Sequence, residues 1–322
     1  MKAALYERNG TASEVLRVEE VARPEPGPGE VRVGVRVSGV NPTDVKSRGG
    51  VTPRPIDGFQ IPHHDGAGVI DAVGPGVDPG RVGQRVWLWL AATRKWGTAA
   101  QWTVVPDPQA VRLPAGVSFD MGANLGVPAL TAHRCLFADG PVDGKSVLVA
   151  GGAGAVGHFA IELARHAGAR VIATVSTPEK AEMAVKAGAH HVVNYRDANV
   201  IEQVRELVDR VDRIVEVALA VNLALDLAVS GPETVIAAYA STGHDPTLPM
   251  RACMGANVTL RFVLLYGVPR LTQQQAATDV TAALAADALS PLPAHRFALD
   301  DIVAAHEAAE KGVTGKILVD VP

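Results

Sequence analysis

The segment IPHHDGAG, at residues 61–68, places two histidines and an aspartate side by side: His63, His64 and Asp65. Imidazole nitrogens and carboxylate oxygens are zinc donors, and a histidine also exchanges a proton near neutral pH. A catalytic zinc needs about three protein ligands. The segment is therefore a candidate part of a metal site or a proton-transfer site. Of the two histidines, His64 is the candidate functional residue, and we expect His63 to be an exposed neighbour.

A second chemical signal is the glycine-rich stretch VLVAGGAGAVG. It fits the pattern G-x-G-x-x-G, and it lies between an apolar strand pattern and a helix pattern. Glycines in this context let the backbone approach a pyrophosphate, and the helix N-terminus offers free N–H groups and a positive dipole end. The candidate dinucleotide-binding residues are Gly151, Gly152, Gly154, Ala155, Val156 and Gly157.

The end of the next strand pattern, VIATVSTPEK, bears on the choice of cofactor. In an NAD site an acidic residue there holds the 2′-hydroxyl of the ribose. No acid stands at Val175, Ser176 or Thr177, and Lys180 follows one turn later. A serine hydroxyl and an ammonium group can bind a 2′-phosphate that an acid would repel. The sequence therefore predicts NADPH rather than NADH.

Secondary-structure elements must position these residues, and the chain shows two kinds of secondary-structure pattern. Residues 30–40 alternate Val31, Val33, Val35 and Val37 with polar residues, which predicts a half-buried strand, and further short strands follow up to about residue 120. Short Val- and Ile-rich strands then alternate with helical patterns. This alternation predicts a parallel, doubly wound α/β sheet.

Composition narrows the class of protein. The chain has 322 residues, a formal charge of −4 and 48% hydrophobic residues, which is typical of a two-domain globular protein. The chain has no basic block, so nucleic acid is not expected as a partner. Two distant cysteines, Cys135 and Cys253, give no disulfide framework or zinc ribbon. The start of the chain lacks an apolar signal core and the longest apolar run is too short to span a bilayer, so we expect a cytoplasmic protein without membrane contact.

An ordered series of motifs carries a family resemblance over nearly the whole chain. It comprises MKAALYE, SGVNPTDVKSRGG, GVIDAVGPGV, VGQRVW, GTAAQWTVVP, GVPALTAH, the glycine-rich unit, AGAHHVVNY and GKILVDV. With these motifs the chain resembles the medium-chain dehydrogenase/reductase superfamily, specifically the zinc-free quinone oxidoreductases related to zeta-crystallin.

The resemblance implies a fold and a set of site residues. It implies a β-rich GroES-like catalytic domain, residues 1–123 and 266–322, and a Rossmann NADPH-binding domain, residues 124–265, with substrate and nicotinamide meeting between them. It implies that Lys180 and Tyr195 flank the 2′-phosphate, with Ser176 nearby. Thr131 is expected near the nicotinamide, and Asn41 near both the nicotinamide and the substrate. Further residues expected to line the nicotinamide pocket are Ala240, Ser241, Leu264 and Leu265. The resemblance also implies a homodimer.

The same resemblance bears on the metal. The metal-dependent branch places a cysteine where this chain has Asn41, a His-Glu pair where it has His64 and Asp65, and a third ligand where it has Gly126. The four-cysteine structural-zinc loop is absent. We therefore expect no zinc, and His64 remains open as a proton donor, a substrate-orienting group or a plain loop residue. Val51 stands where related quinone reductases often carry a tyrosine, so the acceptor pocket departs from the family pattern.

The function predicted is hydride transfer from NADPH to a quinone or an α,β-unsaturated carbonyl, with Asn41, His64 and Thr131 as the candidate catalytic residues. Three alternatives remain open at this point. They are an enoyl reductase acting on a tethered or biosynthetic substrate, a zinc alcohol dehydrogenase, and a non-catalytic NADPH-binding protein on the same fold.

Overall fold

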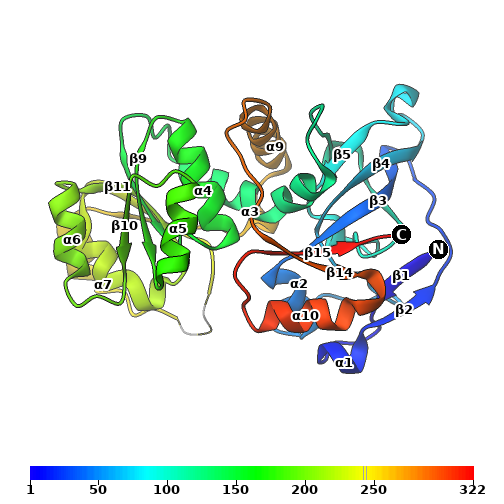
Figure 1. Ribbon diagram of the computed structural model, residues 1–322, viewed down its shortest axis with the longest axis horizontal. Helices are drawn as coiled ribbons and strands as arrows, with labels where there is room; N and C mark the ends of the chain where they lie inside the picture. The colour runs from blue at the N-terminus through cyan, green and yellow to red at the C-terminus, as the bar shows by residue number, and fades with distance from the viewer. Residues whose placement is uncertain (242, 244) are drawn as a thin grey trace. The chain divides into compact units, whose positions relative to one another are not determined.

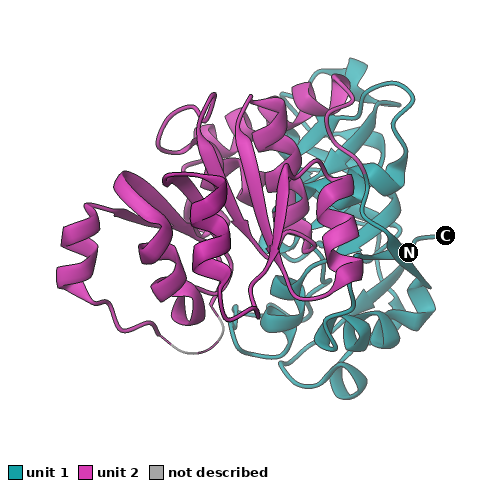
Figure 2. Cartoon of the chain, turned by 60° about the vertical axis from the view of Figure 1, so that its left-hand side comes forward, with its two compact units in different colours: residues 1–127, 291–322 teal, residues 128–290 magenta. Residues whose placement is uncertain are grey.

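The computed structural model describes residues 1–241, 243 and 245–322. The chain forms two compact units (Figure 2). Unit 1 comprises Met1–Val127 and Pro291–Pro322, and unit 2 comprises Pro128–Ser290. The fold is mixed α/β, as the sequence predicts, and each unit has its own sheet (Figure 1).

Unit 1 is built on a seven-stranded, mainly antiparallel sheet in the order β14-β15-β3-β4-β5-β7, with β6 also paired to β3. The strands are β3 (Glu30–Val40), β4 (Asp65–Val73), β5 (Arg85–Leu88), β6 (Trp102–Pro106), β7 (Ala110–Arg112), β14 (Ala294–Ala298) and β15 (Lys316–Asp320). A separate two-stranded sheet pairs β1 (Lys2–Leu5) with β2 (Arg17–Glu20). The last strand of the chain is thus paired with β3, which places residues from both ends of the sequence in one sheet.

Strand β3 shows why the sequence forms this sheet. Val31, Val33, Val35 and Val37 are buried, as their alternation predicts. Arg32, expected on the solvent side, is also buried, because its guanidinium is held by Asp71, with Nε 2.9 Å from Oδ1. A buried arginine persists only where such partners compensate its lost hydration.

The helices of unit 1 are short. They are α1 (Ala12–Val15), α2 (Pro42–Arg48) and α10 (Ile302–Glu310), with 3-10 turns at Pro79–Arg81, Ala91–Thr93, Asp107–Gln109 and Leu299–Asp301. Helix α10 packs against α1, α2 and β15. Its buried Ile302 and Ala305 join a core cluster with Leu5 and Ile317. The C-terminal segment is therefore part of the hydrophobic core of unit 1.

Unit 2 is the doubly wound sheet that the strand–helix alternation predicts. Its six parallel strands run in the order β10-β9-β8-β11-β12-β13. They are β8 (Ser146–Ala150), β9 (Arg170–Val175), β10 (His191–Asn194), β11 (Val211–Glu216), β12 (Ser230–Ala238) and β13 (Thr259–Phe262). The order reverses between β8 and β11, and ligands of such sheets bind at the carboxyl ends of the strands near this switch point.

Helices connect these strands. The connecting helices are α4 (Ala155–His166), α5 (Pro178–Lys186), α6 (Val200–Leu207), α7 (Leu219–Val229) and α8 (Met250–Ala256). A 3-10 turn at Leu265–Gly267 and helix α9 (Arg270–Ala285) follow the last strand. Thr177 is the N-cap of α5, since its hydroxyl accepts a hydrogen bond from Lys180 N at 3.4 Å. Helix α3 (Phe119–Phe137) carries the chain from unit 1 into unit 2 and is kinked at Gly126, ahead of Pro128.

Residues 266–290, which the sequence analysis places in the catalytic domain, lie in unit 2. Three contacts inside unit 2 hold this segment. Gln273 Nε2 donates to Leu265 O at 2.7 Å, His133 Nε2 lies 2.9 Å from Asp279 Oδ2, and Ser290 N donates to the Glu162 carboxylate at 3.1 Å. The last two contacts join residues 146 and 128 positions apart, so no local pattern signals them.

A search of the described residues finds no helix long and apolar enough to cross a membrane.

Candidate active site

The glycine-rich turn joins β8 to α4, as predicted. Gly151 has a φ of +70°, a left-handed conformation that favours glycine. A Cβ on Gly157 would lie 2.3 Å from Gly151 O, so the first turn of α4 can pack against the loop only with glycine there. Gly152 is buried beside Ala173, whereas Gly154 is exposed and Ala155 and Val156 open the helix. The turn therefore presents backbone N–H groups at a helix N-terminus, as a pyrophosphate site requires.

Three residues predicted to hold a 2′-phosphate lie at the adjacent strand ends. Lys180 Nζ donates to Ser176 Oγ at 3.5 Å, and both follow β9. Tyr195 follows β10, and its N donates to Val175 O at 3.0 Å, which fixes it beside the end of β9. The Tyr195 side chain is 43% exposed and open to a ligand. The structure thus brings Ser176 and Lys180 together and places Tyr195 at the same edge of the sheet.

A pocket of about 310 Å³ opens at the carboxyl ends of β11, β12 and β13. Ala240, Ser241 and Leu264, which the resemblance places near the nicotinamide, are among the residues that line it. Leu265 is buried next to them but is not a lining residue. Thr131 is buried in α3 of unit 2. Tyr239, which no motif of the sequence singles out, also lines the pocket. Burial raises the pKa of its phenol far above the usual value.

In unit 1, Asn41 is the residue immediately before α2 and is 3% exposed. Its Nδ2 donates to Asp65 Oδ2 at 2.7 Å, and its Oδ1 accepts from Lys316 Nζ at 2.7 Å. Lys316 Nζ also lies 3.3 Å from Asp65 Oδ2, which closes a buried triangle of amide, carboxylate and ammonium. We call Asn41, Asp65 and Lys316 the polar triangle. Burial raises the pKa of the Asp65 carboxyl, and the Lys316 charge opposes that rise.

The Asp65 carboxylate also lies against Gly126, the position at which the metal-dependent branch of the superfamily carries its third ligand. Asp65 Oδ1 accepts from Val127 N at 2.8 Å, and a Cβ on Gly126 would lie 1.9 Å from this oxygen. The Asp65 side chain therefore occupies the space that a ligand at residue 126 would use. The described part of the chain contains no group of three or more His, Cys, Asp or Glu residues able to hold a metal ion. The residues present do not fit a catalytic zinc.

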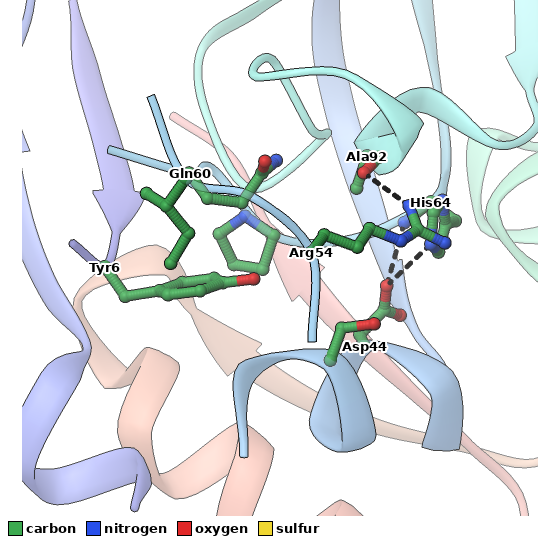
Figure 3. A pocket seen from close by; sticks show the side chains of 9 residues that line it. Tyr6, Asp44, Arg54, Gln60, His64 and Ala92 are labelled. Carbon is green, nitrogen blue, oxygen red and sulfur yellow. Dashed lines mark hydrogen bonds and ion pairs between the residues drawn. The ribbon is translucent and has the colours of Figure 1, made fainter. Parts of the chain in front are cut away.

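His64 is 1% exposed and faces a small pocket within unit 1 (Figure 3). Its backbone N donates to Asp44 Oδ1 at 3.2 Å, and its Nε2 lies 4.0 Å from the same oxygen. Figure 3 shows the Arg54 side chain beside His64 and Asp44, with Nη1 donating to Ala92 O at 3.0 Å. Burial, assisted by the Arg54 charge, lowers the pKa of His64 to about 3. His64 is therefore an uncharged imidazole at neutral pH.

Asp44 is the other titratable group of this pocket. It accepts from Asn41 N at 2.8 Å through Oδ2 and from His64 N through Oδ1, so it ties the start of α2 to the histidine segment. Burial, followed by the nearby Asp65 charge, raises the pKa of Asp44 to about 7.

The prediction for His63 is wrong, because its ring is fully buried. Its backbone has a φ of +76°, which costs a residue with a side chain roughly 1–2 kcal/mol. Its Nδ1 lies 2.8 Å from Ser38 Oγ, and its Nε2 lies 2.9 Å from His306 Nε2 on α10. A single-sequence pattern does not show a partner 243 positions away.

Lys316, Asp44 and Arg54 are site residues that the sequence analysis missed. Asp44 stands three residues after Asn41, in the spacing of a helix N-terminus, and this was a usable signal. Lys316 carried no such signal, because it comes into contact with Asn41 only through the pairing of β15 with β3.

Two family models match the chain. The family model described as "Alcohol dehydrogenase GroES-like domain" matches residues 27–115, and the model described as "Zinc-binding dehydrogenase" matches residues 155–283. The quinone oxidoreductase of Homo sapiens is 31% identical over 312 residues, which cover 95% of this chain and 94% of that protein.

Solved structures agree in fold. An NAD-dependent alcohol dehydrogenase superposes with a TM-score of 0.91 at 26% identity and covers 100% of both chains. A mycobacterial protein, Rv1454c, complexed with NADPH, superposes with a TM-score of 0.87 at 29% identity and covers 99% of both chains. The two units and their sites define a medium-chain dehydrogenase/reductase. The chain belongs to the quinone oxidoreductase family of that superfamily and is an oxidoreductase.

Proposed function

We propose that this chain transfers hydride from NADPH to a quinone or an α,β-unsaturated carbonyl without zinc. The observation that carries the proposal is the polar triangle, in which the Asn41 amide is held by Asp65 and Lys316 at 2.7 Å each. A chain that reduces an activated double bond needs hydrogen-bond donors for the developing oxyanion, and a buried amide and ammonium meet that need.

The cofactor proposal rests on unit 2. The glycine turn fits a pyrophosphate, and Ser176 and Lys180 stand where an NAD site carries an acid. The NADPH complex of the mycobacterial relative supports this choice, and the likeness to an NAD-dependent dehydrogenase does not outweigh it, because residues 175–177 contain no carboxylate.

Bound NADPH supplies the hydride, and the residues of this chain must orient the acceptor and stabilise the anion that hydride addition leaves on it. Asn41 has a second Nδ2 hydrogen besides the one donated to Asp65, and this N–H is suited to the acceptor oxygen. Lys316 adds a positive charge behind the amide. Since the pKa of His64 lies at about 3, we propose that His64 orients groups in its pocket and that solvent supplies the proton.

We further propose a cytoplasmic homodimer. Strand β13 is the edge strand of the parallel sheet, and Phe262 at its end is 69% exposed. Met250 and Met254 on α8 are each 73% exposed. A sheet edge flanked by exposed apolar side chains is a surface suited to pairing with a second copy. The molar mass from light scattering tests this, and a monomer would contradict it.

The test of function is NADPH oxidation by purified, EDTA-treated protein with a panel of quinones and a panel of enones, each repeated with NADH. Turnover with either panel and a preference for NADPH supports the proposal. Activity lost with EDTA and restored by zinc would indicate an alcohol dehydrogenase. Turnover only with thioester-linked enoyl substrates would indicate an enoyl reductase. NADPH binding without turnover on any panel would indicate a non-catalytic protein.

A further inference from the structure

His63 combines three properties that a passive core residue does not need together. Its backbone is left-handed, its ring is fully buried, and both ring nitrogens contact polar atoms. It directly precedes His64 and Asp65, and Asp65 anchors the polar triangle. Retained backbone strain beside a candidate site is a reason to look for a function of the strained residue.

The ring of His63 belongs to a continuous hydrogen-bonded series of four buried side chains, those of His306, His63, Ser38 and Thr98. His306 Nε2 lies 2.9 Å from His63 Nε2, and His63 Nδ1 lies 2.8 Å from Ser38 Oγ. Ser38 Oγ lies 2.7 Å from Thr98 Oγ1, and Thr98 Oγ1 donates to Asp65 O at 2.5 Å. We call this hydrogen-bonded series the histidine relay. It begins on α10, crosses β3 and ends on the backbone carbonyl of Asp65.

Counting hydrogens fixes the direction of every bond in the relay. A carbonyl oxygen only accepts, so the Thr98 hydroxyl donates its one hydrogen to Asp65 O. Ser38 must then donate to Thr98 Oγ1, and its own oxygen must accept from His63 Nδ1–H. Burial lowers the pKa of His63 well below its ordinary value, so its ring carries a single proton, which lies on Nδ1. His63 Nε2 is then an acceptor, and His306 Nε2–H donates to it. Both histidines are neutral, with His63 protonated at Nδ1 and His306 protonated at Nε2.

The end point of the relay is the backbone of the residue that orients Asn41. Asp65 receives the Thr98 hydroxyl on its carbonyl, and its carboxylate binds Asn41 Nδ2 and Val127 N. The backbone of His63 is also fixed, because Thr98 N donates to His63 O at 3.0 Å. Displacement of the relay would thus rotate or shift Asp65, and with it the Asn41 amide.

We propose that His63 is a positioning residue of the reductase, which acts through Ser38, Thr98 and Asp65 to hold the Asn41 amide in its productive orientation. This inference rests on the proposed function, because it assigns His63 a role in the same reaction. His63 touches no reacting atom, so its effect falls on turnover and leaves NADPH binding in unit 2 intact.

The kinetic test compares His63→Gly with wild type. Glycine accepts the left-handed backbone, so this variant removes the ring without adding backbone strain. We expect kcat to fall roughly ten- to hundredfold, because small misplacements of a reacting group have effects of this size. The KM for NADPH should stay within about twofold. His166→Gln, which changes an exposed histidine at the end of α4, is the control and should leave both constants unchanged.

Two substitutions at the far end of the relay give an independent test if His63→Gly fails to fold. Glutamine at residue 306 can still donate an N–H to His63 Nε2, whereas leucine cannot. His306→Gln should keep kcat near the wild-type value, and His306→Leu should lower it as His63→Gly does. Equal rates for the two variants, or a His63→Gly enzyme with unchanged kcat, would overturn the proposal.

The tautomers give a readout that does not depend on activity. In ¹⁵N-histidine-labelled protein at pH 7, two-bond ¹H–¹⁵N spectra should show His63 protonated at Nδ1 and His306 at Nε2. The opposite tautomer of His63 would contradict the relay. A wild-type protein that turns over no acceptor would contradict the proposed function instead, and the tautomers would then decide whether the relay exists.

Discussion

The Asp65 carboxylate occupies the space next to the Gly126 backbone, so that a Cβ on residue 126 would lie 1.9 Å from Asp65 Oδ1. This oxygen accepts from Val127 N across 62 positions of sequence. The contact lies at the kink of α3, and the carboxylate occupies the space that a metal ligand at residue 126 would need.

The first prediction concerns the stability of a variant at Gly126. Gly126→Ala should lower the free energy of unfolding by about 3 kcal/mol, because the methyl group and the buried carboxylate cannot share this space. Urea denaturation measures the change. Gly255→Ala, in α8, where a Cβ would meet nothing within 4 Å, is the matched control and should be neutral or stabilising. Equal stability of the two variants would show that Asp65 moves aside without cost.

A second prediction concerns the choice between cofactors. Lys180→Ala should raise the Kd for NADPH about tenfold or more and leave the Kd for NADH nearly unchanged, because the ammonium binds only the 2′-phosphate. Ser176→Asp should reverse the preference, since a carboxylate repels the phosphate and accepts from the 2′-hydroxyl. Titration by fluorescence measures both constants. Lys186→Ala, at the end of α5, is the control. An equal rise in the Kd for NADPH and the Kd for NADH in Lys180→Ala would contradict the assignment of Lys180 to the 2′-phosphate.

A third prediction concerns acid stability. Burial, assisted by the Arg48 charge, lowers the pKa of His306 to about 3, below its ordinary value of 6.5. The unfolded chain binds a proton at this residue below pH 6.5 and the folded chain does not, so this stabilisation is complete above pH 6.5 and is lost as the pH falls toward 3.

His306→Gln should therefore reduce the dependence of the free energy of unfolding on pH by about 1.4 kcal/mol per pH unit between pH 4 and 6. Urea titrations at several pH values compare the two slopes. His166→Gln, which changes an exposed histidine at the end of α4, is the control. A variant slope equal to that of wild type would mean that His306 takes up its proton in the folded chain.

A fourth prediction concerns His64. His64→Ala should lower kcat and leave the Kd for NADPH unchanged, because the ring lies in a pocket of unit 1 beside Asp44. The pKa of His64 lies at about 3, so the ring stays neutral between pH 5.5 and 7.5. The pH profile of kcat over this range should therefore have the same shape in His64→Ala as in wild type. An unchanged kcat would make His64 a bystander. A step near pH 6.5 that disappears in the variant would show that it titrates as an acid after all.

A fifth prediction concerns metal. Dialysis against EDTA should leave turnover unchanged, and the purified protein should contain well below one equivalent of zinc, because Asn41 and Gly126 replace two of the ligands that a catalytic site needs. Elemental analysis and an assay before and after dialysis test this. Stoichiometric zinc together with an EDTA-sensitive rate would contradict the proposal.

The sequence by itself determined the features that local pattern encodes. The strand, glycine turn and helix from Ser146 to His166, the cap at Thr177 and the absence of an acid after β9 could all be predicted, because each depends on neighbours within one or two turns of the chain. Such local preferences are the same in any fold that places a strand before a helix.

The tertiary structure alone decided what surrounds Asp65. The pairing of β15 with β3 brings Lys316 to Asn41 across 275 positions, and the packing of α10 brings His306 to His63 across 243. The same packing buried a histidine that the sequence suggested was exposed. These contacts depend on the registers of a sheet whose strands come from both ends of the chain, and no property of residues 61–68 contains that information.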